Sequence, residues 1–329
     1  MSGNDVFFAD LAACYDDPLR FVLWAFPWGT TPELSLVTLK EPWASRYPGC
    51  KYGPDKWACE VLDYIGEQVR ANAFDGVHAV KPVQVAVASG HGLGKSAITA
   101  WLVCWIMATR PGAKGAVTAN TASQLETKTF AEISKWLKRS LVRDMFDIKA
   151  SSVVQKDEPE SWRVDALTCR EENSEAFAGQ HAASSTSFYI FDEASAVPDK
   201  IWEVAEGGLT DGEPMWFVFG NPTRNTGRFK ECFGRFREQW KTFQIDSREA
   251  QITNKEQIAV WAKEYGEDSD FFRVRVRGQF PNASTTQFIP TKLAEDAMAR
   301  PAPARHRIAT AIVGVDVARF GDDDTVIVT

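Results

Sequence analysis

The chain has 329 residues, with 37 basic and 44 acidic side chains and a formal net charge of −7. Its hydrophobic content of 44% and charged content of 25% are typical of globular proteins, which excludes global disorder and fibrous architectures. The length exceeds that of one typical domain, so we expect one large domain and a smaller addition. The acidic balance argues against a protein that coats nucleic acid through bulk charge, although a local basic strip is compatible with it.

The N-terminal sequence, MSGNDVFFADLAACYDD, carries acids where a secretory signal needs bases. The longest apolar run, 97–108, is far shorter than the ~20 residues that span a bilayer. The six cysteines form no C-x-x-C pair, so neither a zinc site nor a disulfide framework is indicated. We therefore expect a soluble intracellular protein with reduced thiols.

Residues 1–80 have the pattern of a helical N-terminal segment. The aromatic-rich stretch 7–28 is interrupted by Pro18 and Pro27. A second stretch, 57–73 (WACEVLDYIGEQVRANA), repeats apolar residues at spacings of three and four, which predicts a helix with one buried face.

From residue 81 onward, short β-type runs alternate with helical segments. The run 84–88 (QVAVA) is followed by a glycine-rich turn and an apolar helix at 97–109, which ends before Pro111. A crossover helix is expected at 123–142. Further strands are expected at 115–119, 162–168, 188–191, 215–219 and 240–245. This alternation predicts an α/β fold with a mostly parallel sheet covered on both faces.

The composition changes near residue 280. Four prolines, at 281, 290, 301 and 303, lie among Ala, Ser and Thr, which indicates a linker with one short helix over 281–307. A new strand–turn–strand pattern follows, and an apolar strand as the last element indicates a truncated chain.

The sequence SGHGLGKS at 89–96 directly follows the QVAVA strand and directly precedes a helix. A phosphate-binding loop needs backbone N–H groups turned toward a phosphate, a lysine for the β- and γ-phosphates and a hydroxyl for magnesium, all at a helix N-terminus. The usual first glycine is replaced by a serine, and the histidine is expected to be a spacer. The expected nucleotide-binding residues are Ser89, Gly90, His91, Gly92, Leu93, Gly94, Lys95 and Ser96. The alternative is a glycine-rich turn with a chance Lys-Ser pair.

Two acids follow the apolar run 188–191. An aspartate at the carboxyl end of a buried parallel strand lies at the sheet edge where ligands bind. There Asp192 would hold magnesium through water, and Glu193 would orient and activate the attacking water. Since Lys95 and Asp192 are 97 positions apart, we expect an intervening strand from 115–119 or 162–168. The alternative is an Asp-Glu pair that caps a helix after an unrelated strand.

The strand 215–219 ends in Gly-Asn-Pro at the same predicted edge. The amide of Asn221 can sense a γ-phosphate or the attacking water there. The alternative is a turn that an Asx-type bond stabilises before Pro222.

Three basic segments have two interpretations each. The segment 221–241 carries six basic and two acidic residues with interleaved aromatic residues, so it is either a strip that contacts DNA phosphates or an amphipathic helix with its aromatic side toward the core. The arginines of 272–277 either track a duplex backbone or belong to a surface strand or a helix end. Arg139 and Arg143 are either arginine fingers for a neighbouring subunit or solvated surface residues.

Together these features resemble the large terminase subunit of tailed bacteriophages, the motor that packages DNA into procapsids. The resemblance covers most of the chain: 17–29 (DPLRFVLWAFPWG), the loop 89–96, 117–124 (VTANTASQ), 175–182 (EAFAGQHA), 191–194 (FDEA), 219–222 (FGNP) and 272–281 (FRVRVRGQFP). It implies that Lys95 and Ser96 bind phosphate and metal, that Asp192 supports the metal, that Glu193 is the catalytic carboxylate, and that Asn221 belongs to the coupling motif.

Two further residues enter through the resemblance. The family often reads adenine with a Trp-Gln pair, and here Trp57 is followed by Ala58, so the glutamine is missing. The tail 314–328 resembles the first hairpin of a ribonuclease-H-like nuclease domain, in which Asp316 matches the metal-binding aspartate and the acids at 322–324 form the turn. Two-metal nucleases need carboxylates from several strands, so we expect no nuclease activity from this chain.

The resemblance implies an additional-strand P-loop ATPase that hydrolyses ATP with Mg²⁺ to drive double-stranded viral DNA into a procapsid. Its expected parts are a helical segment (1–80), the ATPase core (81–227), a lid (228–280), a linker (281–307) and the start of a nuclease domain (308–329). The implied partners are double-stranded DNA, the portal protein, the small terminase subunit and further copies in a ring, in the cytoplasm of the bacterial host. The alternatives are a helicase-like DNA translocase and a non-hydrolysing nucleotide-binding scaffold.

Overall fold

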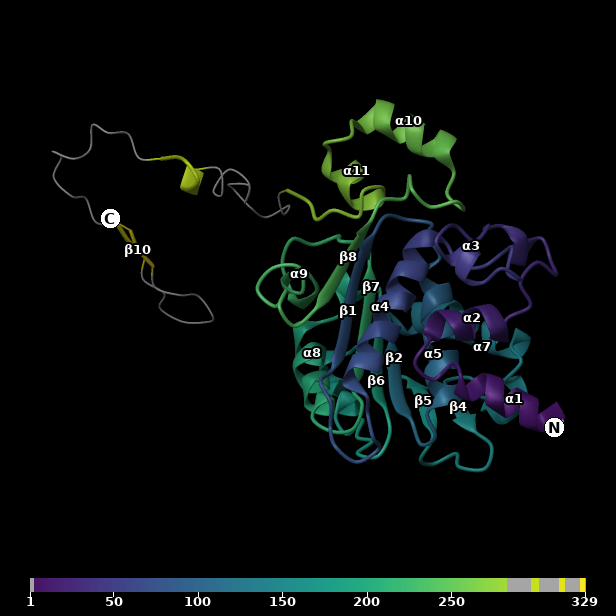
Figure 1. The fold of residues 1–329 in the computed structure, drawn as a ribbon. Helices are drawn as coiled ribbons and strands as arrows, with labels where there is room; N and C mark the ends of the chain where they lie inside the picture. The colour runs from purple at the N-terminus through teal and green to yellow at the C-terminus, as the bar shows by residue number, and fades with distance from the viewer. Residues whose placement is uncertain (1–2, 283–296, 302–313, 317–325, 329) are drawn as a thin grey trace. The chain divides into compact units, whose positions relative to one another are not determined.

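The computed structural model describes residues 3–282, 297–301, 314–316 and 326–328. The chain divides into two compact units, Met1–Pro281 and Asn282–Thr329. The first contains an eight-stranded sheet in the order β3-β4-β5-β2-β6-β7-β1-β8 (Figure 1). The strands are β1 (Val83–Ser89), β2 (Lys114–Thr118), β3 (Phe146–Ile148), β4 (Ser152–Gln155), β5 (Arg163–Ala166), β6 (Ser187–Asp192), β7 (Met215–Gly220) and β8 (Lys241–Ile245). Neighbours from β5 to β8 are parallel, whereas β3, β4 and β5 are antiparallel.

Helices pack on both faces of this sheet (Figure 1). The α-helices of this unit are α1 (Gly3–Ala12), α2 (Pro18–Ala25), α3 (Trp43–Arg46), α4 (Lys56–Asn72), α5 (Lys95–Thr109), α6 (Ala122–Gln124), α7 (Ala131–Arg139), α8 (Asp199–Glu206), α9 (Arg228–Glu231), α10 (Lys255–Tyr265) and α11 (Asp270–Arg275). A π-helical segment, Leu125–Phe130, joins α6 to α7. One-turn 3₁₀ helices lie at Glu33–Ser35, Arg143–Met145, Ala194–Ala196 and Gly207–Leu209, and a longer one covers Glu171–Phe177.

The sheet separates two apolar clusters because successive residues of a strand face opposite sides. In β1, Val85 and Val87 face a cluster with α2, α4, α5 and α7, whereas Ala86 and Ala88 face a second cluster with α8 and α9. The second cluster holds three tryptophans, and Trp216 packs there with Trp202 and Trp240 at centroid distances of 5.3 Å each. The mostly parallel sheet with a cover on both faces confirms the predicted fold class.

The predicted elements between residues 1 and 119 agree with the structure. The helix expected at 57–73 is α4, and the apolar helix expected at 97–109 is α5, which begins two residues earlier. Pro18 occupies the first turn of α2, where its missing N–H costs nothing, and the side chain of Asp17 accepts a hydrogen bond from the Arg20 N–H at 2.9 Å.

Both segments expected to intervene along the chain between Lys95 and Asp192 form strands, β2 and β5, but the strand between β1 and β6 in the sheet is β7. Val85 of β1 and Ile190 of β6 are both register partners of Phe217 in β7. The segment 115–119 instead forms β2, on the far side of β6. All of these strands are apolar on both faces, so their hydrophobic pattern cannot determine their order.

The segment 221–241 is not one amphipathic helix, since helical structure there is limited to α9. Its aromatic residues nevertheless face the core: Phe229 and Trp240 are buried, and Phe233 and Phe236 are half-buried against the same cluster. The strand β8 lies inside the range 228–280 expected for a lid, yet it pairs with β1 at the edge of the main sheet. This strand therefore belongs to the main sheet.

After β8, the helices α10 and α11 have a small apolar cluster of their own. Ile258 of α10 packs there with Phe272 of α11 and with Val276, and Trp261 adds to the cluster. The arginine-rich segment 272–277 is the end of α11 and the residues after it, which agrees with its interpretation as a helix end.

In the second unit the described residues include β9 (Gly314–Asp316) and β10 (Val326–Val328), which pair antiparallel with Asp316 opposite Val326. These two strands agree with the two strands of the predicted pattern, and the residues between them lie outside the described part of the chain. Most of the linker expected at 281–307 and the acids at 322–324 lie outside the described residues. Within the described part of the chain, no helix has the length and apolar character needed to cross a membrane.

Candidate nucleotide site

The glycine-rich loop 89–96 connects the carboxyl end of β1 to the first turn of α5. Gly92 and Gly94 have φ angles of +76° and +82°, which side chains with a Cβ rarely adopt. Gly90 is required for a different reason, because a Cβ there would overlap the Ser247 hydroxyl and the Val276 carbonyl. The loop is therefore shaped by its own backbone angles and by the chain that follows β8.

Lys95 is the first residue of α5, and its side chain is 9% exposed. Its Nζ lies 3.2 Å from Oδ1 of Asn221 and 3.4 Å from the Gly90 carbonyl oxygen. Burial lowers the pKa of Lys95, and the nearby carboxylates of Glu193 and Asp192 oppose that shift. The lysine is thus held inside the loop, between β1 and β7.

Asn221 follows β7 directly and is buried. Its Nδ2 donates a hydrogen bond to the Ser89 carbonyl at 2.6 Å, while its own carbonyl accepts one from the Ser195 hydroxyl at 2.7 Å. The side chain therefore bonds to the loop, and the backbone of the same residue bonds to the turn after β6. The Asx-type turn before Pro222 was the alternative, and these contacts point the amide toward the loop instead.

Asp192 ends β6, and its side chain accepts hydrogen bonds from three groups. The Thr129 hydroxyl donates to Oδ2 at 2.7 Å, and the Ser96 hydroxyl lies 3.4 Å from the same oxygen. The Glu193 N–H donates to Oδ1 at 3.1 Å. Among the described residues no cation forms an ion pair with this carboxylate, so its charge is available to a ligand.

Glu193 has φ 54° and ψ 44°, the left-handed conformation. A non-glycine residue in this region costs about 1–2 kcal/mol, and such residues cluster at functional sites. Burial raises the pKa of its carboxyl group, Lys95 lowers it, Asp192 raises it and Lys128 lowers it. A strained, half-buried acid next to a buried lysine is the arrangement expected of a catalytic carboxylate.

His91 is anchored through its backbone. Its N–H donates to the Arg275 carbonyl at 2.8 Å, and its carbonyl accepts from the Ser247 hydroxyl at 2.9 Å. The surrounding chain partly removes its imidazole from water. This desolvation, together with the positive charges of Lys95 and Arg275, lowers the pKa of His91 to about 4. The expected spacer thus also ties the loop to α11.

Trp57 lies away from the loop residues, in the first turn of α4. It lines a cavity of about 220 Å³ with Asp55, Glu60 and the end of β8. Its Nε1 is buried, and none of the described residues accepts a hydrogen bond from it. Because Ile245 of the same cavity accepts a hydrogen bond from the Gly90 N–H, this cavity borders the loop.

Arg139 and Arg143 are not joined to the loop by any hydrogen bond or ion pair between described residues. Arg139, at the end of α7, forms an ion pair with Glu33 at 2.9 Å, and Arg143 is exposed beside Asp144. Asp316 is the last residue of β9, and its side chain lies outside the described part of the structure.

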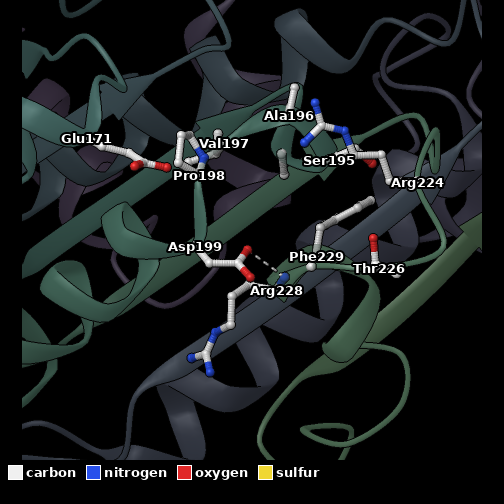
Figure 2. Close-up of a pocket in the computed structure, with 12 residues that line it drawn as sticks. Glu171, Ser195, Ala196, Val197, Pro198, Asp199, Arg224, Thr226, Arg228 and Phe229 are labelled. Atoms are coloured by element: carbon white, nitrogen blue, oxygen red, sulfur yellow. Dashed lines mark hydrogen bonds between the residues drawn. The ribbon is translucent and has the colours of Figure 1, made fainter. Parts of the chain in front are cut away.

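A larger cavity of about 560 Å³ follows the same two strand ends. The cavity is lined by residues 194–199, which follow β6, by Arg224 and residues 226–229, which follow β7, and by Glu171 (Figure 2). Asp199 accepts a hydrogen bond from the Arg228 N–H at 2.9 Å across this cavity (Figure 2). Residues that line the cavity therefore follow shortly after Glu193 and after Asn221 in the chain.

Thr129 was missed by the sequence analysis. It lies in a segment that was expected to be a plain crossover helix, and a threonine there carries no signal of its own. Only the fold brings it to Asp192, 63 positions away.

No family model matches the chain. The chain is 30% identical over 219 residues to a probable terminase, large subunit, of Enterobacteria phage P7, and the match covers 60% of this chain and 42% of that protein. The chain thus spans less than half the length of this relative.

Among solved structures, the large terminase of a thermophilic bacteriophage has a TM-score of 0.54 at 14% identity, over 70% of this chain and 54% of that chain. The same protein in complex with ADP also has a TM-score of 0.54, at 15% identity and the same coverage. The large terminase of bacteriophage HK97 has a TM-score of 0.51 at 13% identity, over 85% of this chain and 58% of that chain. The chain is thus similar in sequence to part of a probable large terminase subunit, and it shares the fold of the large terminases of these bacteriophages.

Proposed function

We propose that this chain is a magnesium-dependent ATPase that drives double-stranded viral DNA into a procapsid. One observation carries the proposal: Lys95, Ser96, Asp192, Glu193 and Asn221 meet at the carboxyl ends of β1, β6 and β7. A phosphate loop, a metal carboxylate and a water-activating acid are the parts that phosphoryl transfer requires. The complexes of the thermophilic bacteriophage's large terminase with ADP and with ATP-γ-S support a nucleotide as the ligand.

In this proposal the loop residues 89–96 bind the phosphates through backbone N–H groups at the N-terminus of α5. Lys95 neutralises charge on the β- and γ-phosphates. Since Asn221 contacts Lys95 with one atom and Ser89 with another, movement of the lysine toward a phosphate changes the contacts of Asn221. This is a physical basis for a coupling role of Asn221.

The oxygen donors at this site fit Mg²⁺. The Asp192 carboxylate and the Ser96 hydroxyl are hard ligands, and among the described residues no cluster of three or more His, Cys, Asp and Glu provides a complete metal cage. Magnesium in nucleotide sites takes one or two protein ligands and fills its shell with phosphates and water. When bound, the ion would neutralise charge that develops on the phosphate oxygens.

Glu193 would accept a proton from the attacking water. Burial raises its pKa, which makes the carboxylate a stronger base than an exposed glutamate, and the positive charge of Lys95 opposes this shift. The left-handed backbone at Glu193 fixes the direction of its side chain as the chain leaves β6. Phe191 of this strand packs against Trp202 and Trp216, and these contacts hold the strand in place.

The finer fold assignment is also a proposal. The insertion of β7 between β1 and β6 supports an additional-strand P-loop fold, with a helical segment at 1–80 and the core from 81. The separate cluster of α10 and α11 supports a small lid after β8. Residues 281–307 would then be the linker and 308–329 the start of a nuclease domain, with Asp316 as one of its metal ligands.

Double-stranded DNA would contact the segment 221–241. Its aromatic residues pack inward, so the charges of Arg224, Lys230, Arg235 and Arg237 remain on the outer side, and among the described residues none of these four forms an ion pair with an acid. Phosphate contacts by such a strip are independent of base sequence and weaken as the salt concentration rises.

The partners proposed are the portal protein, the small terminase subunit and further copies in a ring, in the cytoplasm of the bacterial host. In a ring, Arg139 would act as an arginine finger only after it leaves Glu33.

Trp57 would contact the base of the nucleotide, since its cavity borders the loop 89–96.

Steady-state ATP hydrolysis, with and without long duplex DNA over a series of salt concentrations, tests this function. We expect magnesium-dependent hydrolysis that DNA stimulates, with a stimulation that salt removes. The matched control is Lys95→Ala, which should abolish hydrolysis in both conditions. A wild-type chain that binds ATP without hydrolysing it would favour a nucleotide-binding scaffold instead.

A further inference from the structure

The π-helical segment Leu125–Phe130 interrupts the crossover helix between α6 and α7. A π-turn inserts one extra residue per turn and weakens the helix locally, and π-turns occur frequently at functional sites. This one directs Thr129 toward the end of β6, where its hydroxyl donates to Asp192 Oδ2 at 2.7 Å. Both side chains are removed from solvent, with Thr129 1% and Asp192 4% exposed.

This hydrogen bond is unusual for a threonine within a helix. Such hydroxyls ordinarily bond to the carbonyl four residues earlier, which keeps the interaction within the helix. Thr127, in the same π-turn, does this with the Ser123 carbonyl at 2.6 Å. Thr129 instead bonds across the fold to a strand end 63 positions away. The contrast indicates that the Thr129 contact serves the carboxylate.

The Asp192 carboxylate is consequently held from three directions. The Glu193 N–H fixes Oδ1, and Thr129 fixes Oδ2 from the side of the π-turn. Ser96 approaches the same Oδ2 from α5, at the longer distance of 3.4 Å. A carboxylate oxygen has two lone pairs, so a strong bond from Thr129 determines which lone pair remains on the side of Ser96.

We propose that Thr129 is a positioning residue for the metal-binding carboxylate: its hydroxyl orients Asp192 so that the carboxylate and Ser96 share one side toward magnesium nucleotide. The inference rests on the proposed ATPase function. It assigns Thr129 no contact with the nucleotide, so its effect passes through Asp192. Groups that orient metal ligands in this way are worth about 10- to 100-fold in metal affinity.

Three variants separate this role from a structural one. Thr129→Val keeps the shape and removes the hydroxyl, Thr129→Ser keeps the hydroxyl, and Thr127→Val removes a hydroxyl from the same turn without touching Asp192. The affinity for a fluorescent ADP analogue is measured with and without Mg²⁺. The affinity for Mn²⁺ in the presence of ADP is measured by electron paramagnetic resonance, and thermal unfolding is recorded for each variant.

We expect Thr129→Val to retain the affinity for metal-free ADP and to bind Mn²⁺ about tenfold more weakly than wild type. The factor by which Mg²⁺ increases the affinity for ADP should fall by the same amount. In Thr129→Ser, the Mn²⁺ affinity and the effect of Mg²⁺ on ADP binding should both lie within about threefold of the wild-type values. Thr127→Val should behave as wild type. An unchanged Mn²⁺ affinity in Thr129→Val overturns the inference.

Equal weakening of metal-free ADP binding by Thr129→Val and Thr129→Ser, together with a lowered unfolding temperature, also overturns it, because that pattern reports a packing role. A wild-type chain that binds ADP neither with nor without Mg²⁺ contradicts the proposed function itself, and the inference fails with it. The two failures are distinguishable, since only the second affects the wild-type protein.

Discussion

The Oδ1 atom of Asn221 lies 3.2 Å from Nζ of Lys95. The two residues are 126 positions apart: Asn221 directly follows β7, and Lys95 begins α5, the helix that follows the adjacent strand β1. Because Nδ2 of the same amide bonds to the Ser89 carbonyl, Asn221 holds both ends of the phosphate-binding loop. The amide is suited to this because it offers a donor and an acceptor on one planar group.

Replacing Asn221 should affect stability and hydrolysis together. In Asn221→Ala the Ser89 carbonyl loses this donor and Lys95 loses an acceptor, which should cost about 1–3 kcal/mol of unfolding free energy. Asn221→Asp keeps the acceptor for Lys95 and should restore part of that loss. Urea unfolding and steady-state hydrolysis measure the two effects. An Asn221→Ala protein with wild-type stability would show that the bridge contributes nothing.

Glu193 should be required for hydrolysis and unfavourable for folding. Glu193→Ala and Glu193→Gly both remove the proton acceptor, so we expect each to lower the hydrolysis rate at least about 100-fold. Only glycine also relieves the left-handed backbone, so Glu193→Gly should be more stable than Glu193→Ala by about 1 kcal/mol. Equal unfolding free energies for the two variants would contradict the strain at this position.

Gly90 should not tolerate a methyl group. A Cβ at Gly90 would overlap the Ser247 hydroxyl and the backbone carbonyl of Val276, so Gly90→Ala must displace the chain after β8 from the loop. We expect a lower unfolding temperature and weaker ATP binding. The control is Gly207→Ala, because a Cβ at Gly207 meets nothing within 4 Å. A Gly90→Ala protein that binds ATP like the control would contradict this packing.

Two histidines should give opposite pH effects on stability. The pKa of His91 is lowered to about 4, so the unfolded chain takes up a proton near pH 6.5 before the folded one does, and stability falls between pH 6.5 and about 4. The pKa of His78 is raised by its hydrogen bond to the Asp75 carboxylate, so its stabilisation is present below pH 6.5 and is lost as pH rises through its folded pKa.

His91→Gln should therefore lose less stability than wild type when the pH is lowered from 8 to 5, and His78→Gln should lose more. Urea unfolding at the two pH values measures both differences. If both variants changed the pH dependence of stability in the same direction, the pKa shift assigned to one of the two histidines would be wrong.

A buried ion pair holds the end of the sheet opposite to the loop. Arg110 donates to Glu213 at 2.9 Å and stacks between the rings of Tyr15 and Trp105, each 4.1 Å away, and the Thr186 hydroxyl also donates to Glu213. Glu213→Ala would leave the guanidinium buried and unpaired, at a cost of about 3–5 kcal/mol.

Glu213→Gln retains an acceptor for Arg110 and should cost less than Glu213→Ala. In both variants the affinity for ATP at a temperature where they are folded should equal that of the wild type, because the pair is remote from the loop. Chemical denaturation gives the first quantity and ligand titration the second. A cost for Glu213→Ala below about 1 kcal/mol would show that solvent reaches the arginine.

The sequence predicted most of the strands and the residues at three of their ends. The loop 89–96 is readable because its chemistry is local: glycines for the backbone, then a lysine and a serine at the start of a helix. Asp192 and Asn221 are readable because each follows an apolar run directly. The burial of the aromatic residues in 221–241 agrees with one of the two interpretations of that segment, but its helical structure is limited to α9, since packing of Phe229 and Trp240 does not require a longer helix.

The sequence alone determined which residues end the strands, because side-chain periodicity and turn chemistry act over a few positions. The tertiary structure decided which strands are neighbours, because strands that are apolar on both faces pair according to the packing of the whole sheet. That choice placed β7 between β1 and β6 and brought Asn221 to Lys95. It also brought Thr129 to Asp192, a contact between two distant segments that no local pattern encodes.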